Sequence, residues 1–447
     1  MLNEKTNAED KGNFLFTIAV SFVAAVGGLL FGFDTGVISG AIPFIKEHFQ
    51  LNVVQTGFAV SNLIIACMIG SFFAGPLTDK FGRKKILILS AFFYTISAVL
   101  SAVPRTFTEL VIARFIGGLG VGSSSVLSPM YIAEIAPAKT RGRLVAINQL
   151  AIVIGILISF FSDWLLVDIG PNNWRWMFGV GIFPSLLFMA ILFLIPESPR
   201  WLVKQGLVEK ARMILAKVGG KTHANMEIDE IQAALTQEHG SYKDLLKPGL
   251  RKALIVGLGL AVFCQITGIN IMIYYSPIIF MKAGFQSSSS AIFGSVLIGF
   301  INLIFTLIGI SLIDKLGRKS LLLYGLGGMG ISIVCVGLLH NSAQFIVIPV
   351  LAYIASFGMS VGVVIWVYLS EIYPTKLRGR AMSIATTAIW FSNVVVSQIF
   401  PWMLDNMKQY AFYVFAVICV IAFIFTKAMV FETKNKSLEE IERHWMS

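Results

Sequence analysis

The chain has 447 residues, of which 56% are hydrophobic and only 13% charged, and its mean hydropathy is +0.79. Soluble domains carry about 25% charged residues, so this composition excludes an ordinary soluble protein. The net charge of +11 would suggest a nucleic-acid partner in a soluble chain, but the placement of the basic residues points elsewhere.

Apolar stretches that reach the ~20 residues needed to cross a bilayer recur from one end of the chain to the other. Helices are expected there, because hydrocarbon offers the backbone polar groups no partner outside their own segment. We therefore predict an all-α polytopic membrane protein with twelve spans, centred near Val26, Ile65, Ile96, Gly118, Gly155, Ser185, Ile266, Leu303, Gly330, Ala355, Val394 and Val420.

The basic residues are distributed unequally between the two sides of these spans. Arg114 lies inside a span, and the loops opposite the N-terminal side hold only Lys46, Arg105, Arg175, Lys282 and Lys408. Cytoplasmic loops collect Lys and Arg, so both termini are predicted to lie in the cytoplasm, with the chain in the inner or plasma membrane. The positive charge thus indicates orientation in a lipid bilayer, and no nucleic-acid partner is expected.

Asp34 and Arg114 are charged residues inside the first and fourth predicted spans. Asp34 lies about 30 Å along the helix axis from a span start near Phe14, and Arg114 lies near the outer start of its own span. Both are expected at similar depth in one bundle, where an unpaired charge is costly. They form either a static ion pair that assembles the bundle or a proton switch, because moving Arg114 away would favour a neutral Asp34.

The longest interruption between spans runs from Glu197 to Lys252 and is rich in charge. Helical patterns around Val208–Val218 and Ile228–Leu235 predict a small cytoplasmic helical subdomain there. The predicted organisation is therefore a six-helix bundle at residues 1–196, a linker subdomain at 197–252, a second six-helix bundle at 253–431 and a cytoplasmic tail at 432–447.

Charged motifs of the first half return in the second half at nearly constant spacing. "AEIAPAKTRGR" from Ala133 corresponds to "SEIYPTKLRGR" from Ser370, and "GPLTDKFGRKK" from Gly75 corresponds to "ISLIDKLGRKS" from Ile310. "PESPR" closes the first half and "FETK" closes the second. Independent markers at nearly one offset indicate an internal duplication.

All these motifs fall at the cytoplasmic ends of predicted spans. They serve either orientation and helix capping alone, or they form ion pairs across helix ends that break when the halves rock. The second hypothesis predicts a latch that closes the cytoplasmic side in the outward-facing state. Its residues are Asp79, Arg83, Glu134, Arg141, Glu197, Arg200, Asp314, Arg318, Glu371 and Arg378.

Together with these repeats, "GGLLFGFDTGVISGA", "RFIGGLGVGSSS", "PESPRWL" and "QITGINIMIYYSP" resemble the motifs of the sugar porter family of the major facilitator superfamily, in the same order and over essentially the whole chain. The resemblance implies two pseudo-symmetric six-helix bundles related by an axis along the membrane normal. It also implies a monomer that imports a monosaccharide (a hexose, pentose or polyol) by alternating access. The family has a carboxylate at the position of Asp34 in its proton symporters and an Asn in many uniporters, so proton symport is implied, with uniport as the alternative.

The resemblance further implies which side chains bind the sugar near the midplane. Side-chain amides donate and accept hydrogen bonds without a charge, and aromatic rings cover the C–H faces of a sugar. The alternative roles are inter-helix hydrogen bonding for the amides and interfacial anchoring for the tryptophans. The implied residues are Gln149, Gln265, Asn270, Asn302, Trp366 and Trp390.

Span seven is expected to be broken in two places. Gln265 and Asn270 would point about 140° apart on a regular helix, so they can face one cavity only if the helix loosens, and Gly268 lies between them. "YYSP", at Tyr274–Pro277, indicates a second break and a candidate outer gate.

The chain departs from the family pattern at two binding positions. Cys264 stands where the first of two glutamines is usual, and Ile389 stands where an amide usually precedes the tryptophan. Both replacements remove partners for sugar hydroxyls. A less polar substrate, such as a deoxy sugar, and weaker binding are the alternative consequences.

Other classes of function find less support in the sequence. The four cysteines are widely separated, the five histidines share no metal-ligand spacing, and no nucleophile–base arrangement is apparent. We therefore expect no cofactor, no metal and no enzymatic reaction. A polytopic membrane enzyme and a channel are the rival classes.

Overall fold

The computed structural model describes residues 12–137, 140–236, 242–373, 377–436 and 438–446, and the regular structure within them is helical. Twelve helical segments in this part of the chain are long and apolar enough to span a membrane, and every predicted span centre falls inside one of them. The prediction of an all-α protein with twelve spans is therefore confirmed.

The N-terminal half contains the first six spans. They are α2 (Phe14–His48), α3 (Val53–Phe81), α4 (Arg83–Ala102), α5 (Phe107–Ile135), α6 (Arg141–Leu166) and a sixth span made of α7 (Asn173–Val180) and α8 (Ile182–Leu192). Glycines bring α3 and α5 into backbone contact. A methyl group at Gly118 would lie 2.2 Å from the Leu63 carbonyl oxygen, and one at Gly122 would lie 2.1 Å from that of Cys67.

The C-terminal half contains the other six spans. They are α12 (Pro248–Ile266) with α13 (Ile269–Tyr274), α15 (Ser288–Leu316), α16 (Arg318–Leu338), α17 (Val347–Met359) with α18 (Val361–Ile372), α19 (Arg378–Asn406) and α20 (Tyr410–Met429). Helix α14 (Ser276–Lys282) follows α13 after Tyr275. Both breaks predicted for span seven are confirmed, at Gly268 and at the "YYSP" segment.

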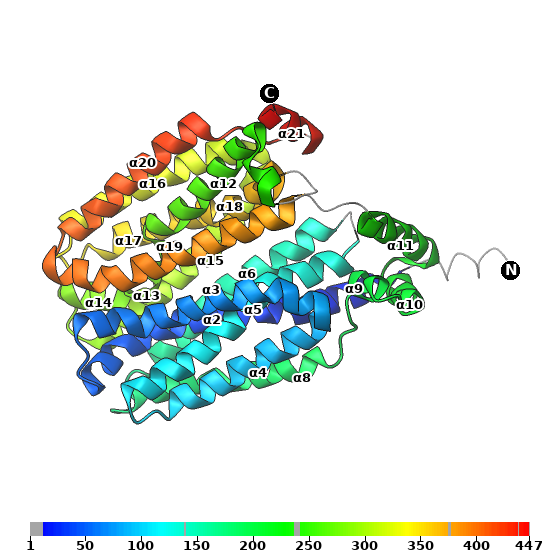
Figure 1. Ribbon diagram of the computed structural model, residues 1–447. Coiled ribbons are helices and arrows are strands. Elements are labelled where there is room, and N and C mark those ends of the chain that lie inside the picture. Colours follow the sequence, from blue (N-terminus) through cyan, green and yellow to red (C-terminus); the bar gives the residue numbers. More distant parts are fainter. Residues whose placement is uncertain (1–11, 138–139, 237–241, 374–376, 437, 447) are drawn as a thin grey trace.

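The linker helices lie outside the two bundles, at the same end of the molecule as the C-terminal helix α21 (Leu438–Met446), as Figure 1 shows. The two predicted linker helices are present as α10 (Val208–Gly219) and α11 (Lys221–Thr236). Leu202, Leu215 and Ile228 contribute to a small separate core. The linker also has the short helix α9 (Pro199–Lys204) and the 3-10 turn η1 (Tyr242–Leu246), which were not predicted because they are too short to show a periodic pattern.

Candidate functional site

A buried ion pair joins the first and fourth spans inside the N-terminal half. Arg114 on α5 donates from Nη1 to Asp34 Oδ1 on α2 at 3.1 Å, and from Nη2 to the Asp34 carbonyl oxygen at 3.4 Å. The Arg114 side chain is 2% exposed and the Asp34 side chain 16%. The ring of Phe178 lies 5.3 Å from the guanidinium carbon. The structure thus brings together the charged residues that were predicted inside the first and fourth spans, with the carboxylate as the more accessible partner.

Two of the implied sugar-binding amides meet at the first break in span seven. Gly268 adopts a left-handed φ of 105° between α12 and α13, which a residue with a side chain rarely does. This turn brings Asn270 Nδ2 within 2.5 Å of Gln265 Oε1. Both side chains are half-buried, so part of their hydrogen-bonding capacity faces accessible space.

Trp390 on α19 lies where the two halves meet. Its side chain is 6% exposed, and its ring packs against Phe31 of α2 with centroids 5.7 Å apart. The indole Nε1 is buried and has no hydrogen-bond partner among the described residues. Because a buried tryptophan usually places its N–H against an acceptor, this donor has capacity for an oxygen atom of a ligand.

The other implied binding residues differ in their surroundings. Gln149 on α6 is half-buried, Asn302 on α15 is buried, and Trp366 on α18 is 40% exposed. A partly exposed amide in the middle of a span is costly against lipid, so the position of Gln149 favours a water-accessible space. Cys264 and Ile389, which replace the usual amides, are 7% and 4% exposed.

Hydrogen bonds join the two halves near the ends that lie away from the linker helices (Figure 1). Gln398 on α19 accepts from Ser61 Oγ at 2.6 Å and donates to the Val54 carbonyl oxygen at 3.1 Å, and both partners belong to α3. The hydroxyls of Ser39 on α2 and Ser276 on α14 lie 3.5 Å apart. The segment after the "YYSP" break is therefore part of this hydrogen-bonded contact between the halves.

A cluster of charges lies at the end of the N-terminal half that is next to the linker helices (Figure 1). Arg83 donates to the two carboxylate oxygens of Glu134 at 3.0 and 2.9 Å, and to Asp79 at 3.3 Å. Glu197 caps α4 by accepting from its first two backbone N–H groups at 2.9 and 3.1 Å. Gly82 permits this approach, because its φ is 96° and a methyl group there would lie 2.3 Å from Glu197 Oε2.

The C-terminal half repeats this cluster group for group. Arg318 donates to Glu371 at 3.2 and 2.8 Å and to Asp314 at 3.1 Å. Glu432 caps α16 by accepting from its first two backbone N–H groups at 2.9 and 3.0 Å. Gly317 has a φ of 87°, and a methyl group there would lie 2.6 Å from Glu432 Oε2. The repeated motifs therefore build the same structure twice.

Two hydroxyl groups that the sequence analysis did not single out complete the clusters. Ser198 donates to Glu134, and Thr433 Oγ1 donates to Glu371 at 2.6 Å. Their positions in the sequence could have indicated this role, because each directly follows the glutamate that caps α4 or α16.

Three residues of the predicted latch lie apart from these clusters. Arg141 lies 3.8 Å from Glu227 of the linker helix α11, so in this structure it pairs with the linker and not with the other half. Arg200 is exposed on α9 and makes no ion pair within the described part of the chain. The side chain of Arg378 lies outside the described residues. The ion pairs described for Arg83 and Arg318 are likewise made within one half.

Comparison with known proteins gives matches over nearly the whole chain. Residues 20–445 match the family model described as "Sugar (and other) transporter". The chain is 41% identical to the arabinose–proton symporter of Bacillus subtilis, covering 96% of this chain and 95% of that protein. It is 38% identical to the D-xylose–proton symporter of Escherichia coli, covering 98% of this chain and 97% of that protein.

Solved structures of the xylose transporter XylE from E. coli share the fold. The inward-open form matches with a TM-score of 0.85 at 35% identity, covering 96% of this chain and 100% of that chain. The form bound to 6-bromo-6-deoxy-D-glucose matches with a TM-score of 0.80 at 36% identity, covering 97% of this chain and 100% of that chain.

Proposed function

The chain belongs to the sugar porter family of the major facilitator superfamily, and on this premise we propose that it imports a monosaccharide together with a proton. The Asp34–Arg114 pair carries the proton part of this proposal, because it offers a partly exposed carboxylate beside a buried cation in one bundle. Relatives that match over nearly the whole chain are named as proton symporters of arabinose and xylose. The substrate class is a pentose, hexose or polyol.

In the proposed coupling step, Asp34 takes up a proton from the outside and gives it up to the cytoplasm. A protonated Asp34 no longer attracts Arg114, so α2 becomes free to move relative to α5. An ionised Asp34 separated from Arg114 would be an unpaired charge in the membrane, so the two residues pair again when the proton leaves. Arg114 stays charged throughout.

Helix α2 connects this pair to the sugar. It carries Asp34, and one turn earlier it carries Phe31, which packs on Trp390 of the other half. It also carries Ser39, which contacts Ser276 near the second break in span seven. A displacement of α2 on protonation therefore reaches both the binding residues and the outer contact.

We propose that the sugar binds between the halves against the residues implied by the family. The paired amides Gln265 and Asn270 supply hydrogen bonds, and Trp390 supplies an apolar face and a free N–H donor. Further contacts come from Gln149, Asn302 and Trp366. The buried Cys264 and Ile389 leave this surface less polar than is usual in the family.

The cytoplasmic clusters hold the ends of each half rigid in this proposal. In the outward-facing state we expect Glu134 and Arg141 to form a latch with Glu371 and Arg378 across the halves. Arg141 is available for such an exchange because its present ion pair with Glu227 is long and its side chain is 44% exposed.

The same proposal includes the orientation of the chain. We propose that both termini lie in the cytoplasm and that the chain acts as a monomer in the bilayer, without chemical change to the sugar. The linker helices and α21 lie at one end of the molecule, where the basic loops also lie, and cytoplasmic loops collect such residues.

Reconstitution into proteoliposomes tests the function. Labelled pentoses, hexoses and polyols are offered with and without a pH gradient, acidic outside. Symport predicts saturable uptake above the external concentration only with the gradient. Uptake that equilibrates equally in both conditions would indicate uniport, non-saturable flux would indicate a channel, and recovery of a chemically altered sugar would indicate an enzyme.

A further inference from the structure

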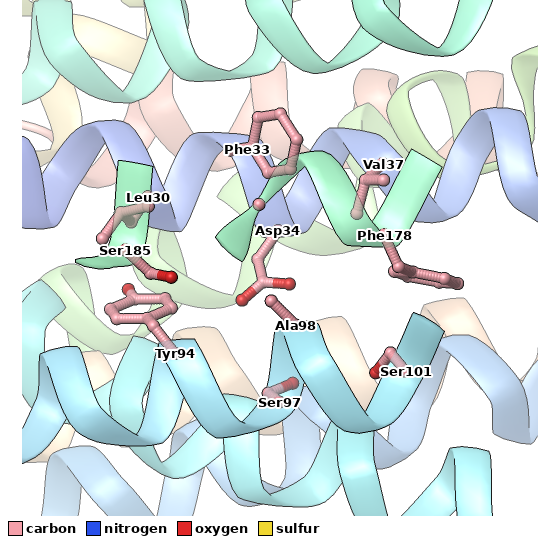
Figure 2. Close-up of a pocket in the computed structure, with 11 residues that line it drawn as sticks. Leu30, Phe33, Asp34, Val37, Tyr94, Ser97, Ala98, Ser101, Phe178 and Ser185 are labelled. Carbon is pink, nitrogen blue, oxygen red and sulfur yellow. The ribbon is translucent and has the colours of Figure 1, made fainter. Parts of the chain in front are cut away.

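A small cavity lies directly against the Asp34 carboxylate. All the residues that line it belong to the N-terminal half, on α2, α4, α7 and α8 or in the bend between the last two, and they leave about 10 Å³ of room for the centre of a water-sized sphere. Figure 2 shows the carboxylate pointing toward α4, which presents Tyr94, Ser97 and Ser101 around the cavity. This room suits a single water molecule in contact with hydroxyl groups.

The hydroxyls on α4 form a file that leads outward from Asp34. Tyr94, Ser97 and Ser101 follow at helical spacing on one face, and α4 ends on the outer side one residue after Ser101. A methyl group at Gly117 would lie 2.4 Å from Ser97 Oγ and 3.7 Å from Asp34 Oδ2, so both oxygens adjoin the same glycine. Ser101 Oγ is buried and has no hydrogen-bond partner among the described residues.

The file continues from Tyr94 toward the cytoplasm. The Tyr94 hydroxyl lies 2.8 Å from Ser124 Oγ on α5. Ser128 follows one turn further toward the cytoplasmic end of α5, and Ser21 lies on the neighbouring α2. The hydroxyl oxygens of Ser128 and Ser21 are both buried without a partner in the described part of the chain.

We propose that the coupling proton reaches and leaves Asp34 along this file of hydroxyls inside the N-terminal half, separately from the sugar, which passes between the halves. The inference rests on the proposed symport. A buried hydroxyl without a protein partner is costly, and water in the cavity would satisfy it. Hydroxyls and water both donate and accept, so a proton can pass along them by exchange of hydrogen bonds.

The transfer makes and breaks only O–H bonds. A proton enters at Ser101, passes through the cavity and Ser97 to the Asp34 carboxylate, and leaves through Tyr94 and Ser124 toward Ser128. Each hydroxyl passes its own proton to the next group and receives one from the group before it, so one proton crosses and every oxygen keeps the same number of protons. The titratable neighbours that act electrostatically on Asp34 or are acted on by it are Arg114, Tyr94 and Cys67.

The C-terminal half supplies matched controls. The offset of 235 that relates Asp79 to Asp314 also relates α4 to α16. Ser332 then corresponds to Ser97, Val336 to Ser101 and Met329 to Tyr94. Ser101→Val therefore copies a residue that the other half already accommodates, while it removes the hydroxyl and fills the cavity. Ser332→Ala removes a hydroxyl from the equivalent helix face, where no part of the file lies.

The experiment measures proton and sugar movements separately in proteoliposomes. A pH-sensitive dye inside reports proton influx when a transported sugar is added outside, and labelled sugar at equal concentrations reports exchange. We expect Ser101→Val and Tyr94→Phe each to slow proton influx about five- to tenfold. This is the change in rate expected when the loss of one hydrogen bond raises the activation free energy of proton transfer. Exchange should stay within about twofold of wild type, as should both rates for Ser332→Ala.

The outcomes separate this path from the function on which it rests. Absence of sugar-driven proton influx in the wild type would overturn the proposed symport and the path together. If the wild type shows sugar-driven proton influx, and Ser101→Val and Tyr94→Phe show influx as fast as that of Ser332→Ala, the path alone would be overturned. A fall of sugar exchange in proportion to proton influx would also overturn it, because the two routes would then not be separate.

Discussion

The two halves of the molecule agree at the ends near the linker helices and differ in the interior of their spans. At the ends, Arg83 and Arg318 hold equivalent carboxylates at nearly equal distances. Inside, the N-terminal half has the ion pair of Asp34 with Arg114, whereas residues 248–274 of the C-terminal half contain no acidic residue at all. If the halves arose by duplication, the charge clusters at the helix ends were retained in both, while the residues inside the spans diverged.

Under the proposed function, this difference corresponds to a separate task for each half. A charge in the membrane interior is costly. We therefore expect the Asp34–Arg114 pair, which only the N-terminal half has, to serve a function that this half alone performs. The N-terminal half carries the proposed proton site, and most of the implied sugar contacts lie in the C-terminal half: Gln265, Asn270, Asn302, Trp366 and Trp390. Coupling then depends on α2, which touches both.

The largest effect is expected from Asp34→Asn, which removes the titratable carboxyl and leaves the N-terminal half, like residues 248–274 of the other, without an acidic group at this site. We expect loss of all uphill sugar accumulation driven by a pH gradient, because the amide cannot take up and release the proton. Sugar binding and exchange should persist. Uptake of labelled sugar into proteoliposomes, with and without the gradient, measures both.

Asp34→Glu is the matched control, because it keeps a carboxyl next to Arg114 and should retain some accumulation. If Asp34→Asn still concentrates sugar against its gradient, Asp34 is not the coupling site. The pair would then be a static contact that assembles the bundle.

A second test asks whether the two charge clusters near the linker helices are also similar in energy, by comparing Arg83→Gln with Arg318→Gln. The side chains of Arg83 and Glu134 are 8% and 9% exposed, so leaving Glu134 unpaired should lower stability by about 3 kcal/mol. Arg318 and Glu371 are 12% and 19% exposed, so solvent screens their pair more and the loss should be smaller, about 2 kcal/mol. Thermal unfolding in detergent compares the two variants.

Arg83→Lys, which keeps the charge but not the bidentate contact, should fall between wild type and Arg83→Gln. Equal destabilisation by Arg83→Gln and Arg318→Gln would show that the difference in burial has no energetic consequence. The halves would then be equivalent at their ends in energy as well as in geometry.

Much of this architecture could be predicted from the sequence because its signals are long or repeated. The spans are long apolar runs, and the motifs of the charge clusters occur in both halves, including Gly82 and Gly317 with their positive φ. The turn at Gly268 was predictable from the five-residue spacing of two amides.

The rest depends on packing that no local pattern encodes. A serine in a span usually bonds its own helix, as Ser90 does to the Ile86 carbonyl oxygen at 2.9 Å. Nothing in the sequence distinguishes Ser101, whose oxygen stays without a partner in the described part of the chain because of its neighbours on other helices. The contact of Arg141 with Glu227 was likewise not predictable, because it depends on where the linker docks.

A third test concerns the proposed sugar binding by the C-terminal half. Cys264→Gln and Ile389→Asn restore the amides that the family usually has beside Gln265 and Trp390. One well-placed hydrogen bond contributes about 0.5–1.5 kcal/mol, so affinity or preference for a polar sugar should change several-fold. Competition of unlabelled sugars for labelled uptake measures the profile, with Cys419→Ser as a control outside the site.

An unchanged profile in both restored variants would mean that these positions do not face the sugar. The less polar surface would then have no bearing on which sugar is carried. A change in one variant alone would assign the contact to that span.

The smallest expected effect concerns Arg141, where the N-terminal half touches the linker. Arg141→Gln removes an exposed ion pair with Glu227 that contributes at most about 1 kcal/mol, so stability should hardly change. If Arg141 also joins the latch of the outward-facing state, its loss favours the inward-open form and slows net uptake a few-fold, while sugar binding survives. Glu227→Gln is the control, because it breaks the linker contact but leaves Arg141 available to the latch. Net uptake at the wild-type rate in Arg141→Gln would show that this charge serves orientation alone, and equal slowing in both variants would assign the effect to the linker.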